Sequence, residues 1–277
     1  MNFTQPIMIN RLLILPVSLL VLIGCTRNQD SSTDPFTTLK NGKFIDLTWS
    51  FDEQSVYWPT NIPFKHETVF DGINDKGYYY SSFKFSAEEH GGTHFDSPMH
   101  FAEGGNSIEK VPVEQLTGEG VVVDVTAKVA ANRDYQVAVA DFEEYEKVNG
   151  RIPDNAIVLI NTGFGKYYPD KEKYTGTLLT GKEGVENLHF PGLHPDAAKW
   201  LATERKIKGV GLDTPSIDYG QSKEFLTHRM LFANNLTAYE NVAHLDQLPP
   251  KGIWIFAFPM KIKGGSGAPL RIIALMP

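Results

Sequence analysis

The chain has 277 residues, of which 42% are hydrophobic and 21% are charged, and its formal net charge is −7 at pH 7. This length and composition are typical of one large globular domain that buries its own core, and they exclude a disordered, collagen-like or coiled-coil protein. The negative charge argues against a nucleic acid as partner, because proteins bind phosphates mainly through an excess of Lys and Arg. The chain has one cysteine, Cys25, which excludes an internal disulfide and a zinc site built from several thiolates.

An apolar segment near the N-terminus ends at this cysteine. Residues 12–23 carry no charge and follow Arg11. They are too few to cross a bilayer as a helix, which takes roughly 20 apolar residues, but they match the apolar core of a secretory signal. The sequence Leu22-Ile23-Gly24-Cys25 resembles a bacterial lipoprotein signal, in which the cysteine is acylated and becomes the mature N-terminus. An ordinary cleaved signal and a buried hydrophobic helix are the alternatives.

These features predict three parts of the chain. Residues 1–24 are a lipoprotein signal peptide, residues 25–35 are the lipidated cysteine and a flexible tether, and residues 36–277 form one folded domain. We therefore expect an exported bacterial lipoprotein that Cys25 anchors to a membrane, facing the periplasm or placed in the outer membrane. Residue 26 is Thr rather than Asp, which in enteric-type sorting implies the outer membrane.

The folded domain shows strand and helix signals in alternation. Pro and Gly are dense from residue 58 to residue 105, which predicts long, structured loops there. Short apolar runs predict central strands, and segments that open with a capping residue such as Ser222 predict helices between some of them. In chain order these are a strand at 120–125, a helix at 141–147, a strand at 156–160, a helix at 194–206, a strand at 209–212, a helix at 223–232 and strands at 253–258 and 270–275. Strands interleaved with helices indicate a single α/β domain with a mixed sheet flanked by helices.

Three of the eight histidines fall between residues 90 and 100, where the sequence reads His-Gly-Gly-Thr-His-Phe-Asp-Ser-Pro-Met-His. In an extended segment His94 and Asp96 share one face, with Cα atoms roughly 6–7 Å apart, so both side chains can reach one ion. His90 needs a bend to join them. The Gly91-Gly92 pair allows such a bend and makes a helix unfavourable, so we expect a bent strand or loop.

Two imidazoles and one carboxylate suit Zn²⁺, Mn²⁺ or Fe²⁺ and leave positions open for water and substrate. A bound metal of this kind lowers the pKa of its water enough to produce hydroxide near neutral pH. His100 lies beyond the turn-forming Pro98 and is not needed as a ligand, so it can act as a general acid and base. The alternative is a polar loop whose histidines are only hydrogen-bonded.

The stretch from His90 to Phe101 resembles the signature of the cyclase family of metal-dependent hydrolases, which includes bacterial kynurenine formamidases. That signature reads His-x-Gly-Thr-His-x-Asp-x-Pro-x-His, and all its fixed positions are present. Further similar blocks are Trp58-Pro59, residues 190–198 and residues 211–218. The C-terminal segment 260–271 is most similar to the isatin hydrolase branch of the family. The resemblance implies a swivelling β/α-type cyclase-family fold.

The resemblance also implies roles for single residues. His90, His94 and Asp96 would hold a first divalent metal ion, Zn²⁺ or Mn²⁺, and Asp96, His228 and Glu240 a second, while His100 would transfer protons. The alternative is that His228 only caps its helix or forms a salt bridge there, and that Glu240 is a surface charge.

We predict two substrate contacts, Trp58 in the matched aromatic segment and Ser266 in a Gly-rich loop near the site; a core position is the alternative for Trp58. The remaining histidines are expected to be structural, namely His66, His189, His194 and His244. Asp213 and Asp218 are expected to brace a loop rather than bind metal.

These roles imply an enzyme that hydrolyses the carbon–nitrogen amide bond of a small molecule. The expected substrate is an aromatic cyclic amide, as in isatin, because export argues against a role in intracellular tryptophan breakdown. An arylformamidase that hydrolyses N-formylkynurenine is the alternative. An alternative of another class is a lipoprotein that binds metal or ligand without catalysis, and such a protein could dispense with His100. Members of the family are commonly dimers or tetramers, so the resemblance implies a homo-oligomer.

Overall fold

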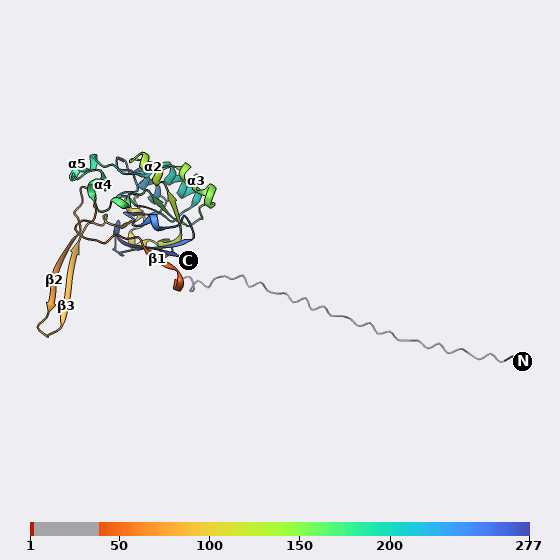
Figure 1. The fold of residues 1–277 in the computed structure, drawn as a ribbon, viewed down its shortest axis with the longest axis horizontal. Coiled ribbons are helices and arrows are strands. Elements are labelled where there is room, and N and C mark those ends of the chain that lie inside the picture. Colours follow the sequence, from red (N-terminus) through yellow and green to blue (C-terminus); the bar gives the residue numbers. More distant parts are fainter. Residues whose placement is uncertain (3–38) are drawn as a thin grey trace.

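The structure is a computed structural model, and it describes residues 1–2 and 39–277 (Figure 1). Most of the predicted signal peptide, the predicted lipidation site Cys25 and the tether lie outside the described residues. The predicted boundaries of these N-terminal segments therefore stay predictions. Among the described residues, no helix combines the length and the apolar character that crossing a bilayer requires.

One mixed sheet forms the centre of the domain. Its strands, in spatial order, are β1 (Lys43–Asp46), β12 (Gly267–Met276), β11 (Ile253–Pro259), β5 (Thr117–Asp124), β7 (Ile157–Asn161), β9 (Gly209–Leu212), β10 (Thr237–Glu240) and β4 (His94–Asp96). The neighbours from β5 to β10 are parallel, and the other neighbours are antiparallel. Because β4 also pairs with β12, the sheet closes on itself and leaves β1 at its edge.

The predicted strands have apolar side chains on both faces because the sheet separates two cores. In β5, Val121 and Val123 belong to the core beneath the helices, whereas Val122 belongs to the core enclosed by the sheet. Strand β7 divides in the same way, with Val158 on the helix side and Leu159 inside. A strand that is buried on both faces reads as a continuous apolar run, which is why these strands were predictable. The expected single α/β domain is confirmed.

Helices cover the outer side of this sheet (Figure 1). They are α2 (Thr126–Ala131), α3 (Val139–Asn149), α4 (Lys171–Thr175), α5 (Gly181–Glu186), α6 (Pro195–Trp200), a π-helical turn (Leu201–Arg205) and α7 (Leu226–Phe232). Short 3₁₀ turns lie at Pro98–His100, Ile108–Lys110, Val113–Leu116, Gly165–Tyr167 and Leu245–Gln247, and β6 (Gln136–Val137) pairs with β8 (Gly192–Leu193).

The three predicted helices are present, but α7 begins later than predicted. Ser222 is not its N-cap, because its hydroxyl binds the Asp218 carboxylate and the N–H of Phe225 ahead of the helix.

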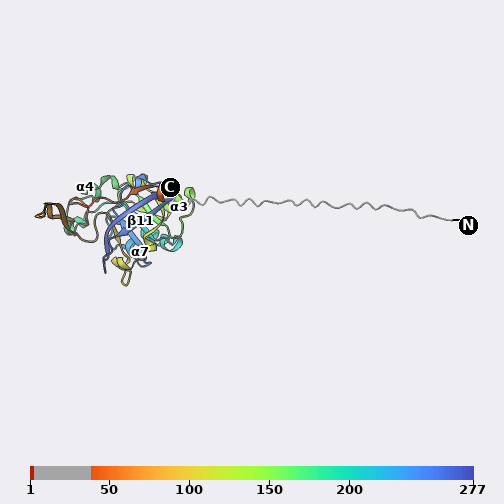
Figure 2. The same cartoon turned by 90° about the horizontal axis from the view of Figure 1, so that it is seen from below.

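The prediction of loops throughout residues 58–105 is wrong in one part. Strands β2 (Lys65–Ile73) and β3 (Tyr79–Ser86) form a hairpin that projects from the body of the domain (Figures 1 and 2). Charged and aromatic residues are mixed along both strands, and neither strand has a buried residue. A sequence search for buried strands therefore has no signal here.

Candidate catalytic metal site

The predicted motif lies at the seam where β4 closes the sheet. His94 and Asp96 lie on β4, and the antiparallel register of β10 places Glu240 directly opposite His94. The chain bends at Gly91-Gly92, as expected. Gly92 has a φ of +57°, and a Cβ at Gly91 would lie 2.1 Å from the Tyr57 ring. Both positions therefore need glycine, and the bend brings His90 back toward Asp96.

The five predicted metal ligands lie together around Asp96. The Nε2 atom of His94 is 3.2 Å from Asp96 Oδ1 and 3.3 Å from Glu240 Oε2. The Nε2 atom of His228, on α7, is 3.1 Å from Glu240 Oε1 and 3.5 Å from Asp96 Oδ2. His90 Nδ1 is 2.7 Å from Asp96 Oδ1. Segments far apart in the sequence thus place three imidazoles and two carboxylates in one cluster.

Two atoms at the centre of this cluster have no hydrogen-bond partner in the protein. They are His94 Nε2 and Asp96 Oδ2, and both are buried. A buried polar atom without a partner is costly and therefore uncommon. Donor atoms of His94, Asp96 and Glu240 lie within 4.8 Å of one another, as do those of His90, Asp96 and His100. The residues present fit a divalent metal ion, which would satisfy the free atoms.

The electrostatics of the cluster also favour a cation. Burial opposes protonation of His94, but Asp96 and Glu240 outweigh it and raise the pKa of His94 to about 10. Burial opposes ionisation of Asp96, yet His94, His228 and His90 hold the pKa of its carboxyl well below its usual range. The carboxylates therefore stay ionised and attract positive charge to their centre. A bound cation would supply that charge in place of protons on the rings.

Three hydrogen bonds orient the imidazole rings. His94 Nδ1 lies 2.9 Å from the carbonyl oxygen of Gly92, and His228 Nδ1 lies 2.6 Å from Asp218 Oδ2. When Nδ1 donates its proton to such an acceptor, Nε2 of the neutral ring carries a free lone pair. That lone pair points to the centre of the cluster. On the other side, His90 Nε2 lies 2.9 Å from the hydroxyl of Ser266.

Asp213 and Asp218, the two residues predicted to brace a loop, have different roles in the structure. Asp213 accepts hydrogen bonds from Thr162 and Gly165, so it braces a loop as expected. Asp218 also accepts from the backbone N–H groups of Thr227 and His228, so it fixes both the ring of His228 and the start of α7. The histidines expected to be structural, which are His66, His189, His194 and His244, lie outside the cluster: on the hairpin, beside Asp134, at the start of α6 and against Trp49.

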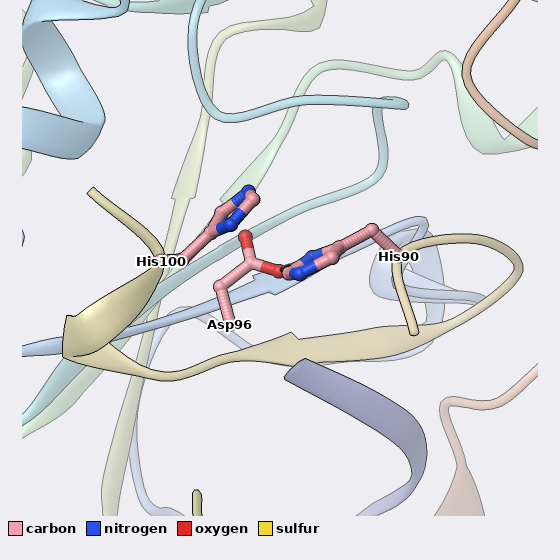
Figure 3. Close-up of side chains that lie close together, drawn as sticks. All are labelled: His90, Asp96 and His100. Atoms are coloured by element: carbon pink, nitrogen blue, oxygen red, sulfur yellow. Dashed lines mark hydrogen bonds and ion pairs between the residues drawn. The ribbon is translucent and has the colours of Figure 1, made fainter. Parts of the chain in front are cut away.

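His100 ends the 3₁₀ turn that follows β4, and its ring stacks on that of His90 with centroids 3.7 Å apart. Figure 3 shows the Asp96 carboxylate pointing toward both of these rings. Burial lowers the pKa of His100 to about 3. The ring is therefore uncharged at neutral pH.

A cavity of about 280 Å³ opens over the cluster. His90, His94, His100, His228 and Glu240 line one part of it, and the remaining wall includes Tyr57, Trp58, Phe101 and Phe225. The predicted contact Trp58 is in this wall and packs against Phe225. Ser266 lies behind His90, where its hydroxyl is held by Glu89. Phe101 and Phe225 were not predicted as cavity residues, although Phe101 directly follows the motif.

The comparisons with known proteins agree with this geometry. The sequence model of the Cyclase family matches residues 45–219, which span the motif and strands β4, β5, β7 and β9 of the sheet. The chain belongs to the cyclase family.

Named cyclase-family relatives are amide hydrolases. The chain is 32% identical over 197 residues to an isatin hydrolase of Roseibium aggregatum, covering 68% of this chain and 72% of that protein. It is 23% identical over 236 residues to a kynurenine formamidase of Bacillus anthracis, covering 85% and 98%. The solved structure of isatin hydrolase A from Ralstonia solanacearum has a TM-score of 0.79 and 31% identity, covering 89% of this chain and 99% of that one. A structure titled a potential metal-dependent hydrolase with cyclase activity shares the fold, at 23% identity and a TM-score of 0.63.

Proposed function

We propose that this cyclase-family protein is a metal-dependent amidohydrolase that opens a small aromatic cyclic amide of the isatin type. One observation carries the proposal: a buried cluster of imidazoles and carboxylates, with free atoms at its centre, faces a cavity that has aromatic side chains in its wall. The names of the isatin hydrolase relatives support the same reaction class.

The cluster residues His90, His94, Asp96, His228 and Glu240 would hold one or two divalent ions, Zn²⁺ or Mn²⁺. When bound, such an ion polarises an amide carbonyl and lowers the pKa of water. The protein's own contribution is orientation, because Asp218 and the carbonyl of Gly92 fix the ring nitrogens that face the centre.

The cavity wall positions the substrate and excludes water. Trp58, Phe101 and Phe225 contribute aromatic side chains to this wall, which suits a flat ring. His100 lines the cavity, and one of its ring nitrogens lies within 4.8 Å of the ligand atoms of His90 and Asp96, so this imidazole is placed to take the proton of the attacking water. It then delivers that proton to the leaving amide nitrogen as the carbon–nitrogen bond breaks. The products are a carboxylate and an aryl amine on one molecule.

The test compares the wild type with His100→Ala after reconstitution with Zn²⁺ or Mn²⁺. Metal content is measured by mass spectrometry, and ring opening of isatin is followed by absorbance. We expect His100→Ala to keep its metal and to lose activity by about 10²–10⁴-fold, the usual contribution of a general acid–base residue. Equal turnover by the two proteins would refute the role of His100, and a wild type that takes up no divalent metal would refute the site.

Arylformamidase activity is the second candidate, because the kynurenine formamidase relative covers 85% of this chain. The same preparations are assayed with N-formylkynurenine, and the two values of kcat/KM decide between the substrates. Metal-loaded protein that turns over neither substrate would instead indicate the binding lipoprotein. A homo-oligomer and anchoring through Cys25 remain part of the proposal. Sedimentation equilibrium of the purified protein tests the first, and the variant Cys25→Ser tests the second, as described below.

A further inference from the structure

Glu89, the residue directly before the metal-binding motif, turns its carboxylate toward the Gly-rich loop formed by residues 264–267. Its Oε2 atom accepts three hydrogen bonds from this loop. The donors are the backbone N–H groups of Ser266, at 2.9 Å, and Gly267, at 3.2 Å, and the Ser266 hydroxyl, at 2.7 Å. Three donors on one carboxylate oxygen fix both the loop and the direction in which the hydroxyl hydrogen points.

The Ser266 hydroxyl lies between this carboxylate and the ring of His90. Its Oγ atom is 2.7 Å from Glu89 Oε2 and 2.9 Å from His90 Nε2. The single hydroxyl hydrogen goes to the carboxylate, because a charged oxygen is a stronger acceptor than a neutral ring nitrogen. Oγ then offers only lone pairs to His90, so the hydrogen of that second bond is on Nε2. A neutral His90 ring with its hydrogen on Nε2 carries a free lone pair on Nδ1.

This arrangement is the reverse of that in the other two imidazoles of the cluster. His94 and His228 have Nδ1 held by an oxygen atom and Nε2 directed to the centre. In His90 the held atom is Nε2, and Nδ1 lies 2.7 Å from Asp96 Oδ1 (Figure 3). A metal-binding imidazole needs a lone pair on the nitrogen that faces the ion. His90 can therefore serve the cluster through Nδ1 only while Nε2 keeps the hydrogen.

The Gly-rich loop also determines where the ring of His90 lies. A Cβ at Gly267 would be 2.5 Å from Cε1 of this ring and 2.8 Å from the carbonyl oxygen of Phe95, so glycine is needed for the ring to approach the loop backbone. The ring of His100 stacks on that of His90, with centroids 3.7 Å apart. The position of His90 therefore also sets the position of His100.

We propose that Glu89 is a positioning residue of the metal site. Through the hydroxyl of Ser266, it holds His90 in the tautomer whose free Nδ1 faces Asp96. Ser266 then acts on a ring of the cluster and not on the substrate, and it lies outside the set of residues that line the cavity. This inference rests on the proposed metal-dependent function, because the tautomer matters only when His90 binds an ion.

A second acidic residue supplies a matched control. Glu109 Oε2 accepts the N–H of Gly264 at 2.9 Å, at the other end of the Gly-rich loop. Glu89→Ala and Glu109→Ala each remove one carboxylate that holds the loop, but only Glu89 directs the hydroxyl of Ser266. If Glu89 had only a structural role, the two variants would behave alike.

The test uses the full chain with Cys25→Ser, so that lipid does not anchor the protein. Competition with a chromogenic chelator measures Zn²⁺ affinity without substrate, and circular dichroism reports folding. We expect Glu89→Ala and Ser266→Ala each to lower the affinity by about 10–100-fold, the usual effect of losing a group that orients a metal-binding imidazole. Glu109→Ala should keep the wild-type affinity. The double variant Glu89→Ala/Ser266→Ala should lose less than the product of the two single effects, because both residues act on one ring.

Two further measurements address the hydroxyl and the tautomer directly. Ser266→Thr keeps a hydroxyl group and is expected to retain most of the affinity that Ser266→Ala loses. In Zn²⁺-loaded wild type with isotope-labelled histidine, nuclear magnetic resonance shows which ring nitrogen carries the hydrogen once the His90 signals are assigned. We expect Nε2–H for His90 and Nδ1–H for His94 and His228.

The outcomes separate this inference from the proposed function. A wild type that takes up no Zn²⁺ would refute both. A wild type that binds Zn²⁺ while Glu89→Ala and Glu109→Ala have equal affinities would overturn the inference alone. The same holds for Nδ1–H on His90, for equal losses in Ser266→Thr and Ser266→Ala, and for fully multiplicative effects of Glu89→Ala and Ser266→Ala.

Discussion

Asp96 is the residue on which the site depends. Its carboxylate faces His90, His94 and His228, and it is buried. The spacing of His94 and Asp96 on an extended segment predicted that these two side chains would converge, since alternate residues of a strand share a face. His228 and Glu240 could not be placed by spacing, because α7 and β10 reach the cluster only through the tertiary fold.

Asp218 illustrates what a single sequence does not reveal. Its carboxylate fixes the ring of His228, but nothing in the local pattern distinguishes it from Asp213, which braces a loop. Both are buried aspartates in one stretch after β9. Only the positions of their partners separate a positioning role at the site from a structural role.

We predict that Asp218→Asn lowers metal affinity by about 10–100-fold, which is typical for the loss of a carboxylate that orients a metal-binding imidazole. The amide can donate to His228 Nδ1 and so favour the wrong tautomer. Affinity is measured by competition with a chromogenic chelator. The matched control is Asp134→Asn, because Asp134 pairs with His189 away from the site. Equal affinity in the wild type and Asp218→Asn would contradict the orienting role.

At the scale of elements, the strands that could be predicted are those whose burial produces a continuous apolar run in the sequence. Strands β5, β7 and β9 are buried on both faces, so each is an apolar run that a sequence search finds. The β2–β3 hairpin is exposed on both faces of the isolated chain, so the same search misses it. The start of α7 was also misplaced, because Asp218 rather than a local N-cap residue binds its first N–H groups.

A half-buried ion pair joins α3 to the π-helical turn after α6. Arg205 contacts Glu146 through two hydrogen bonds of 2.6 Å and 2.7 Å, and Glu146 also accepts from the N–H of Ile152. The hydrogen bonds from Arg205 lower the pKa of Glu146. A lowered pKa in the folded state stabilises the protein above the ordinary pKa of Glu, and this stabilisation is lost as the pH falls through the folded value.

We therefore predict that Glu146→Gln lowers the free energy of unfolding by about 1–3 kcal/mol at neutral pH, the usual value for hydrogen bonds to a charged group. The difference from the wild type should shrink as the pH falls below the ordinary pKa of Glu and through the lowered pKa of folded Glu146, because the carboxyl group then becomes uncharged like the amide of Gln. Urea unfolding at several pH values measures it. Glu143→Gln, on the same helix with an exposed side chain, is the control and should have little effect. A pH-independent difference would show that packing, not charge, is lost.

At the scale of the whole molecule, the domain combines a closed sheet, a site at its seam and the projecting β2–β3 hairpin rooted beside that site. The seam is formed by β4, which pairs with both β10 and β12. The hairpin directly precedes the motif, because β3 ends at Ser86 and His90 follows a few residues later.

The N-terminal segment is predicted to decide where this protein works, and a substitution of Cys25 tests that prediction. If the lipoprotein prediction holds, the wild type incorporates labelled fatty acid and sediments with membranes, whereas Cys25→Ser does neither, because a short apolar segment holds a protein at a membrane weakly without an acyl chain or a full span. An unlabelled wild type in the soluble fraction would indicate an ordinary cleaved signal. A Cys25→Ser protein that still sediments with membranes would indicate that the apolar segment is retained and that lipid is not the anchor. Because Cys25 is the only cysteine in the chain, the label has one thiol to report on, and each of the three alternatives has its own outcome.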